Sequence, residues 1–178
     1  MRVINLKNLL FILCICLGAI VFGADSYAKK DDMFSNSGLP LPRFVSLAEN
    51  KANVRAGPGQ KYPIKWVLNR KGLPMEVILE FDHWRKIKDH EGQVGWVFHS
   101  LLSGKRTAIT VGENYINAYE KPFLGKGEKS RISILLEPFV IVSLDSCGGA
   151  WCKVITKEYS GWVKRKLLWG VYESENID

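Results

Sequence analysis

An internal repeat restricts the fold of this chain more than any other feature of its sequence. Gly95-Trp96-Val97, with a Leu pair three residues later, recurs as Gly161-Trp162-Val163 with the same spacing to a second Leu pair. A Trp-x-Lys-Ile/Val segment begins about eleven residues before each Gly-Trp-Val, at Trp84 and at Trp151. A pattern repeated in this order predicts that the chain folds as two similar units.

Two further segments recur upstream of these, so four anchors appear twice in the same order. Pro74-Met75-Glu76-Val77-Ile78 corresponds to Pro138-Phe139-Val140-Ile141-Val142, and Asn53-Val54-Arg55 corresponds to Asn117-Ala118-Tyr119. We therefore predict a tandem of two units of about 60 to 65 residues, near residues 44–105 and 106–172.

The apolar residues occur in short runs that indicate strands. Val77, Leu79 and Phe81 alternate with other residues, β-branched and aromatic residues are frequent, and no stretch keeps a helical period for three turns. Each Trp-x-Lys segment, polar turn and Gly-Trp-Val segment predicts a hairpin. The fold class is therefore all-β. A tryptophan repeated at a fixed position in a strand is expected in the core, so we assign Trp96 to it, whereas Trp84 beside a turn fits either role.

The first unit resembles the bacterial SH3 domain family. The family's Asn-Val-Arg-x-Gly-Pro-x-x-x-Tyr opening corresponds to Asn53–Tyr62, and its later Lys-Gly, Trp-x-Lys-Val and Gly-Trp-Val marks are present as well. The second unit keeps the Asn at 117 and a Pro at 122 but loses the Arg and the Gly-Pro-Gly. The resemblance implies two five-stranded, partly open barrels that bind cell-wall peptidoglycan or its peptides, or dock a protein.

The N-terminus predicts export. Residues 1–28 combine Arg2 and Lys7, an apolar run and the small-x-small pattern of Ser26-Tyr27-Ala28, which is typical of a signal peptide. Cleavage after Gly23 is the competing choice. An uncleaved anchor is disfavoured, because the run of about 14 residues falls short of the roughly 20 that cross a bilayer. We expect residues 29–43 to be a linker and the protein to reside in the periplasm or cell envelope.

Cys147 and Cys152 remain after removal of the signal. An even pair in an exported protein favours a disulfide, and the intervening Gly148-Gly149 predicts a hairpin tip. A catalytic or metal-binding thiol is the alternative, but a zinc site would need further ligands, and the three histidines lie far away in the sequence without paired spacing (His83, His90, His99). We expect no cofactor and no catalysis.

The chain is basic. Its formal charge of +7 becomes +6 when Arg2, Lys7 and Asp25 leave with the signal, and residues 44–105 hold four of these units. Such a chain is attracted to anionic polymers, and the first unit is the expected contact. Export disfavours nucleic acid as the partner. We interpret the cluster Lys164-Arg165-Lys166 as the solvated end of a strand rather than as a site for polyanions.

We predict the ligand site in the first unit, as a groove lined by Tyr62, Trp66 and Trp84 with Arg55 at its rim. Tyr62 and Trp66 have no aromatic counterpart in the second unit, so the shared fold does not explain them. Arg55 could bind a carboxylate or satisfy carbonyls of its own loop. We expect Gly57 and Gly59 to be turn residues with positive φ. The expected function is wall binding, with protein docking as the alternative; the oligomeric state stays open.

Overall fold

The computed structural model describes residues 37–123, 127 and 129–178. The predicted signal at 1–28 and most of the predicted linker lie outside these residues. Within the described part of the chain, no helix has the length and apolar character needed to span a bilayer.

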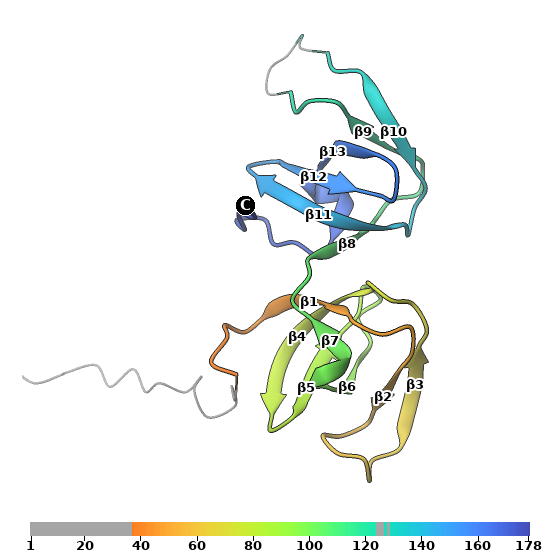
Figure 1. Cartoon of the computed structure of the whole chain (residues 1–178), viewed down its shortest axis with the longest axis vertical. Helices are drawn as coiled ribbons and strands as arrows, with labels where there is room; N and C mark the ends of the chain where they lie inside the picture. The colour runs from red at the N-terminus through yellow and green to blue at the C-terminus, as the bar shows by residue number, and fades with distance from the viewer. Residues whose placement is uncertain (1–36, 124–126, 128) are drawn as a thin grey trace, which may run out of the picture. The chain divides into compact units, whose positions relative to one another are not determined.

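The first antiparallel sheet has the strand order β3-β2-β6-β5-β4-β1-β7. Figure 1 shows it from orange to green. Its elements, in chain order, are β1 (Arg43–Leu47), β2 (Ala52–Arg55), β3 (Ile64–Leu68), β4 (Pro74–Phe81), β5 (Trp84–Lys88), β6 (Val94–Phe98), the 3₁₀ turn η1 (His99–Leu101) and β7 (Leu102–Ser103).

The second sheet repeats this order as β10-β9-β13-β12-β11-β8-β14. Its elements are β8 (Thr107–Thr110), β9 (Ile116–Tyr119), β10 (Ile132–Leu136), β11 (Ile141–Gly148), β12 (Trp151–Ile155), β13 (Ser160–Lys164), the 3₁₀ turn η2 (Arg165–Leu167) and β14 (Leu168–Trp169). The all-β class and the tandem repeat are confirmed. Each sheet has seven strands instead of five, because a strand before the first anchor and a two-residue strand after the 3₁₀ turn join it.

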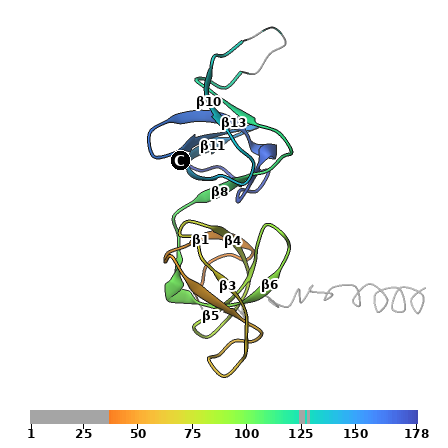
Figure 2. The same cartoon turned by 90° about the vertical axis from the view of Figure 1, so that its right-hand side faces the viewer.

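The predicted hairpins are present with matching register in both units, and Figure 2 shows β5 and β6 of the first one. Trp84 pairs with Phe98 in the first hairpin, and Trp151 pairs with Lys164 in the second. The tips of the β4–β5 and β11–β12 hairpins each contain a turn residue at positive φ, Asp82 at 50° and Gly149 at 53°. The two units therefore share one frame, in which residues can be compared position by position.

The assignment of Trp96 to the core is wrong. Its neighbours Gly95 and Val97 are buried, and Val97 belongs to the core cluster of the first unit, whereas Trp96 is only half-buried. Successive side chains on a strand point to opposite faces, so Gly95 and Val97 face inward and Trp96 faces outward. The spacing shared by the two repeats therefore indicates a strand at this position and does not indicate burial of the indole.

Cys147 and Cys152 form a disulfide between directly paired residues of β11 and β12. Their Cα atoms are 4.1 Å apart, and both residues are buried in the second core cluster. The predicted disulfide is confirmed. The hairpin tip lies at Gly149-Ala150, because Gly148 still pairs with Trp151. These two thiols are joined and do not serve as free nucleophiles.

We expect the double variant Cys147→Ala, Cys152→Ala to lose about 2 kcal/mol of unfolding free energy, because a short loop removes little entropy from the unfolded chain. Urea denaturation of the variant and the wild type measures the difference. A second barrel that fails to fold without the bond would contradict this role as a local staple.

A buried carboxylate ties the start of the described chain to the first sheet. The Glu80 side chain is fully buried, and its carboxylate accepts hydrogen bonds from Arg43 and from the Ser37 hydroxyl, with Arg85 Nε 3.0 Å away. Burial raises the pKa of the Glu80 carboxyl, but the hydrogen bonds from Arg43 and Ser37 outweigh it and hold the pKa below its ordinary value. The ionised form is therefore the stabilising one.

Glu80→Gln should lower the unfolding free energy by about 3 to 5 kcal/mol, because two partly buried guanidinium groups lose their counter-ion. Since the folded pKa is depressed, this stabilisation is present above the ordinary value of 4.5 and disappears as the pH falls through the folded pKa. Urea midpoints at neutral pH and at about pH 3 should differ less in the variant than in the wild type. Equal pH dependence in both proteins would contradict the assignment.

Candidate functional site

The first barrel contains a hollow of about 470 Å³ that we call the first-barrel hollow. Arg55 and Trp84, two of the four predicted site residues, line it. Lys51 and Phe98 line it as well, and the Phe98 ring meets Trp84 edge to face at 5.5 Å. The hollow therefore combines cationic side chains with aromatic faces, a combination suited to an anionic ligand that also has an apolar or flat portion.

Arg55 donates hydrogen bonds to backbone carbonyl groups of its own loop. Its Nη1 donates to the carbonyl oxygen of Gln60 at 3.1 Å and to that of Tyr62 at 2.8 Å. These bonds close the segment that joins β2 to β3. The arginine in the family's opening motif thus positions the rim of the hollow, and the carbonyl alternative raised from the sequence accounts for its contacts.

Tyr62 does not line the first-barrel hollow; it packs on Gly57. A Cβ added at Gly57 would lie 2.5 Å from the Tyr62 ring, so only glycine fits beneath this ring. The expectation that Gly57 and Gly59 have positive φ is wrong, because neither is among the glycines with that conformation. The close approach of an aromatic ring, rather than turn geometry, requires glycine at position 57.

Trp66 also lies outside the first-barrel hollow. Its ring packs against the core cluster of the first barrel, and a Cβ at Gly95 would lie 3.1 Å from it. The indole Nε1 is buried and finds no acceptor among the described residues. The structure thus unites Arg55 and Trp84 in one hollow and gives Tyr62 and Trp66 packing positions elsewhere.

The second barrel has a hollow of about 370 Å³ at the equivalent place, which we call the second-barrel hollow. Tyr115, Tyr119, Lys164 and Lys166 line it, together with one carboxylate, that of Glu113. By repeat position Tyr119 replaces Arg55 and Lys164 replaces Phe98. Both hollows therefore hold positive charge beside aromatic rings, although different strands supply each.

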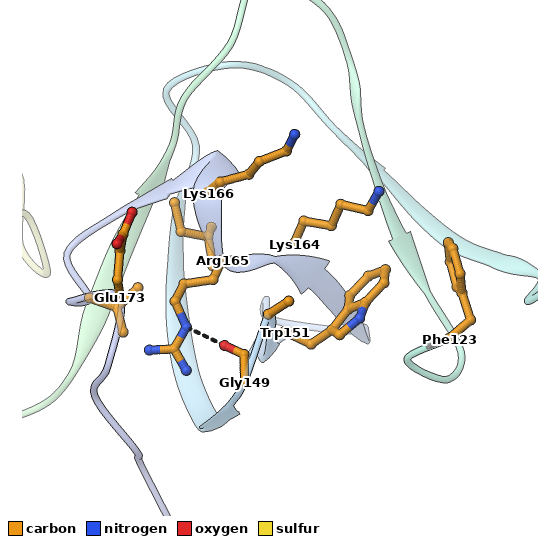
Figure 3. Close-up of a pocket in the computed structure, with 10 residues that line it drawn as sticks. Phe123, Gly149, Trp151, Lys164, Arg165, Lys166 and Glu173 are labelled. Carbon is orange, nitrogen blue, oxygen red and sulfur yellow. Dashed lines mark hydrogen bonds between the residues drawn. The ribbon is translucent and has the colours of Figure 1, made fainter. Parts of the chain in front are cut away.

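A larger cavity of about 940 Å³ opens in the second barrel beside this hollow, and we call it the tail pocket. Figure 3 shows Phe123 and Trp151 at one end, Glu173 at the other, and Lys164, Arg165 and Lys166 between them. Tyr119, Phe123 and Trp151 form an aromatic cluster, with ring centroids 4.9 to 5.9 Å apart. Lys164 Nζ lies 5.8 Å from the Phe123 ring and 5.9 Å from the Trp151 ring.

The C-terminal segment forms one wall of the tail pocket because Arg165 holds it in place. Arg165 is buried and donates to the carbonyl oxygens of Gly149, Tyr172 and Glu175. Ile177 exchanges two backbone hydrogen bonds with Cys147. The interpretation of residues 164–166 as one solvated strand end is therefore wrong for Arg165, which is structural, while Lys164 and Lys166 are exposed.

A second carboxylate fixes the same segment. Glu175 accepts hydrogen bonds from Arg106 and from the backbone N–H of Tyr172. Burial raises the pKa of the Glu175 carboxyl, but these hydrogen bonds outweigh it and keep the pKa below its ordinary value. The carboxylate thus helps to hold the wall against the pocket at neutral pH.

Sequence reasoning missed the tail pocket. Its walls come from η2, the β11–β12 tip and the C-terminal residues. The repeat pattern gives no reason to expect these segments to meet. The two lysines flanking Arg165 were visible in the sequence, but their proximity to Phe123 and Trp151 depends on the fold. Among the described residues, no cluster of three or more His, Cys, Asp or Glu side chains is placed to bind a metal ion.

The comparisons identify the family. The bacterial SH3 domain family matches residues 48–104 and again residues 112–170, so the chain belongs to this family. No curated protein matches. Two solved structures from Trichomonas vaginalis are similar: NlpC2, at 11% identity and a TM-score of 0.33 over 72% of this chain, and NlpC1, at 12% identity and a TM-score of 0.33 over 77%. The matches cover 48% and 49% of those chains, so this chain spans about half their length.

Arg55→Ala should loosen the loop that the arginine closes. We expect a loss of about 1 to 2 kcal/mol of unfolding free energy, since two charge-assisted hydrogen bonds are removed at a half-buried position. Amide hydrogen exchange should become faster within residues 56–62 and stay unchanged in β11 and β12. Unaltered exchange in the loop would contradict this structural role and favour the alternative that Arg55 contacts the ligand.

Proposed function

We propose that this protein is an exported, non-catalytic binding protein of the bacterial cell envelope, whose SH3 barrels hold peptidoglycan or its peptides. The observation that carries the proposal is the equivalent hollow in the two barrels, each combining cationic side chains with aromatic rings. Wall polymers present carboxylates on peptides together with the flat faces of sugar rings. Cations and aromatic faces in one hollow complement both features.

Three further features support this function. The family membership of both barrels agrees with a binding role. The signal predicted at residues 1–28 agrees with an envelope location, and the disulfide agrees with it too, because disulfides persist in oxidising compartments. The two cysteines that could have suggested a thiol-dependent enzyme are bonded to each other. Docking of an envelope protein in the same hollows is the alternative function.

Sedimentation with insoluble peptidoglycan tests wall binding. We expect the wild type to sediment at about 0.15 M salt and to remain bound at about 0.5 M, because contacts inside a hollow are screened less than diffuse surface charge. Trp84→Ala should weaken retention by at least about tenfold, as expected for an aromatic anchor. Lys51→Ala, at an exposed position of the first-barrel hollow, should weaken it as well.

The matched control is Lys71→Ala, which removes an exposed lysine of the first barrel that does not line the hollow. It should sediment like the wild type. If the Lys51 and Lys71 variants lose retention equally, or if all proteins detach together as salt rises, diffuse attraction explains the binding. That result would refute wall recognition and favour the docking alternative.

A further inference from the structure

The tail pocket shares Lys164 and Lys166 with the second-barrel hollow but extends over a corner that is filled in the first barrel. At the corresponding corner of the first barrel, Phe98 takes the position of Lys164, and its ring packs on Trp84. His83 and His99 stack beside it with ring centroids 5.4 Å apart. In the second barrel Ala150 and Arg165 replace these imidazoles. Rings fill this corner in the first barrel, and the replacements leave a cavity in the second.

The charges of the tail pocket point to an anionic ligand. Arg165 is directed away into its carbonyl acceptors, as the dashed bond in Figure 3 shows for Gly149. Lys164 and Lys166 are exposed, and within residues 37–123, 127 and 129–178 neither forms an ion pair. Two like charges at one wall repel each other, and an anion between them relieves that repulsion.

The remaining walls of the tail pocket indicate which other chemical groups would fit there. Phe123 and Trp151 form an apolar end beside the lysines, and Leu168 and Val171 extend the apolar surface. A polymer of bare phosphates would leave this surface in contact with water. A peptide carboxylate next to an apolar side chain would satisfy both the lysines and the rings. Glu173, at the far end in Figure 3, disfavours a second acidic group there.

We propose that the tail pocket binds a peptide with a free carboxylate next to an apolar side chain, with Lys164 and Lys166 as the carboxylate contacts. The site is separate from the first-barrel hollow and does not depend on wall binding there. A wall peptide and the C-terminus of a protein both offer this chemistry. The pocket recognises the carboxylate and the adjoining side chain, whichever molecule supplies them.

The test is a titration of the purified full chain with acetyl-Ala-Leu-Ala, once as the free acid and once as the C-terminal amide. The Trp151 indole resonance, assigned with Trp151→Phe, and the backbone amides of residues 164–166 are followed by NMR. The free acid should shift these signals and bind about tenfold more tightly than the amide, because one charge-assisted contact is worth about that factor.

Variants separate the lysines from general charge. Lys164→Met with Lys166→Met should bind the free acid about tenfold more weakly, and Lys164→Arg should keep the binding because it keeps the charge. Lys157→Met, at an exposed lysine of the same barrel that does not line the pocket, should match the wild type. Equal binding of acid and amide, or equal loss in the Lys157 variant, would overturn the proposal.

A second arm identifies the source of the peptide and keeps the two proposals apart. Soluble muropeptides and a synthetic peptide that ends like a protein C-terminus with an apolar residue beside its carboxylate are titrated in the same way, and whichever shifts Trp151 identifies the source. Failure of sedimentation with normal Trp151 shifts would refute wall binding and leave the pocket intact. Sedimentation without any Trp151 shift would refute the pocket and leave wall binding intact.

Discussion

Both barrels depend on a place where two strands approach so closely that no side chain fits between them. A Cβ at Gly95 would lie 2.3 Å from Val54 Cγ1, and one at Gly161 would lie 2.9 Å from Ala118 Cβ. Real Cβ atoms do not approach other atoms so closely, so glycine is required where β6 pairs with β2 and where β13 pairs with β9. Three residues after each glycine, Phe98 ends β6 and Lys164 ends β13, and these two residues line the hollows.

Repeat spacing predicts the elements that the two barrels share. The hairpins, the tandem arrangement and the cross-strand cysteine pair all follow from local pattern and compartment. Site residues were harder to predict, because an unshared aromatic residue can fill space that a neighbouring glycine leaves open. Tyr62 does this over Gly57 and Trp66 does it beside Gly95. The absence of a counterpart in the second unit therefore indicates local packing, not a ligand.

The tail pocket could not be read from the sequence for a different reason. Arg165 lies between two lysines and looks like them, yet its acceptors are carbonyls up to 16 residues away. Burial with three carbonyl acceptors converts one charge of a basic cluster into a structural element and leaves its neighbours facing solvent. Only the folded position of the C-terminal segment separates these roles, since it supplies two of the carbonyls.

Net charge and local charge consequently diverge between the two barrels. Residues 44–105 carry +4 and residues 106–178 carry +1, so the field seen from a distance favours the first barrel. A bound ligand responds to the charges within a Debye length, about 8 Å at physiological salt. At that range Lys164 and Lys166 face a cavity with aromatic walls, while acidic residues elsewhere in the second barrel lower its total. The barrel with the smaller net charge can therefore be the more selective for an anion, because two of its lysines lie together beside aromatic rings.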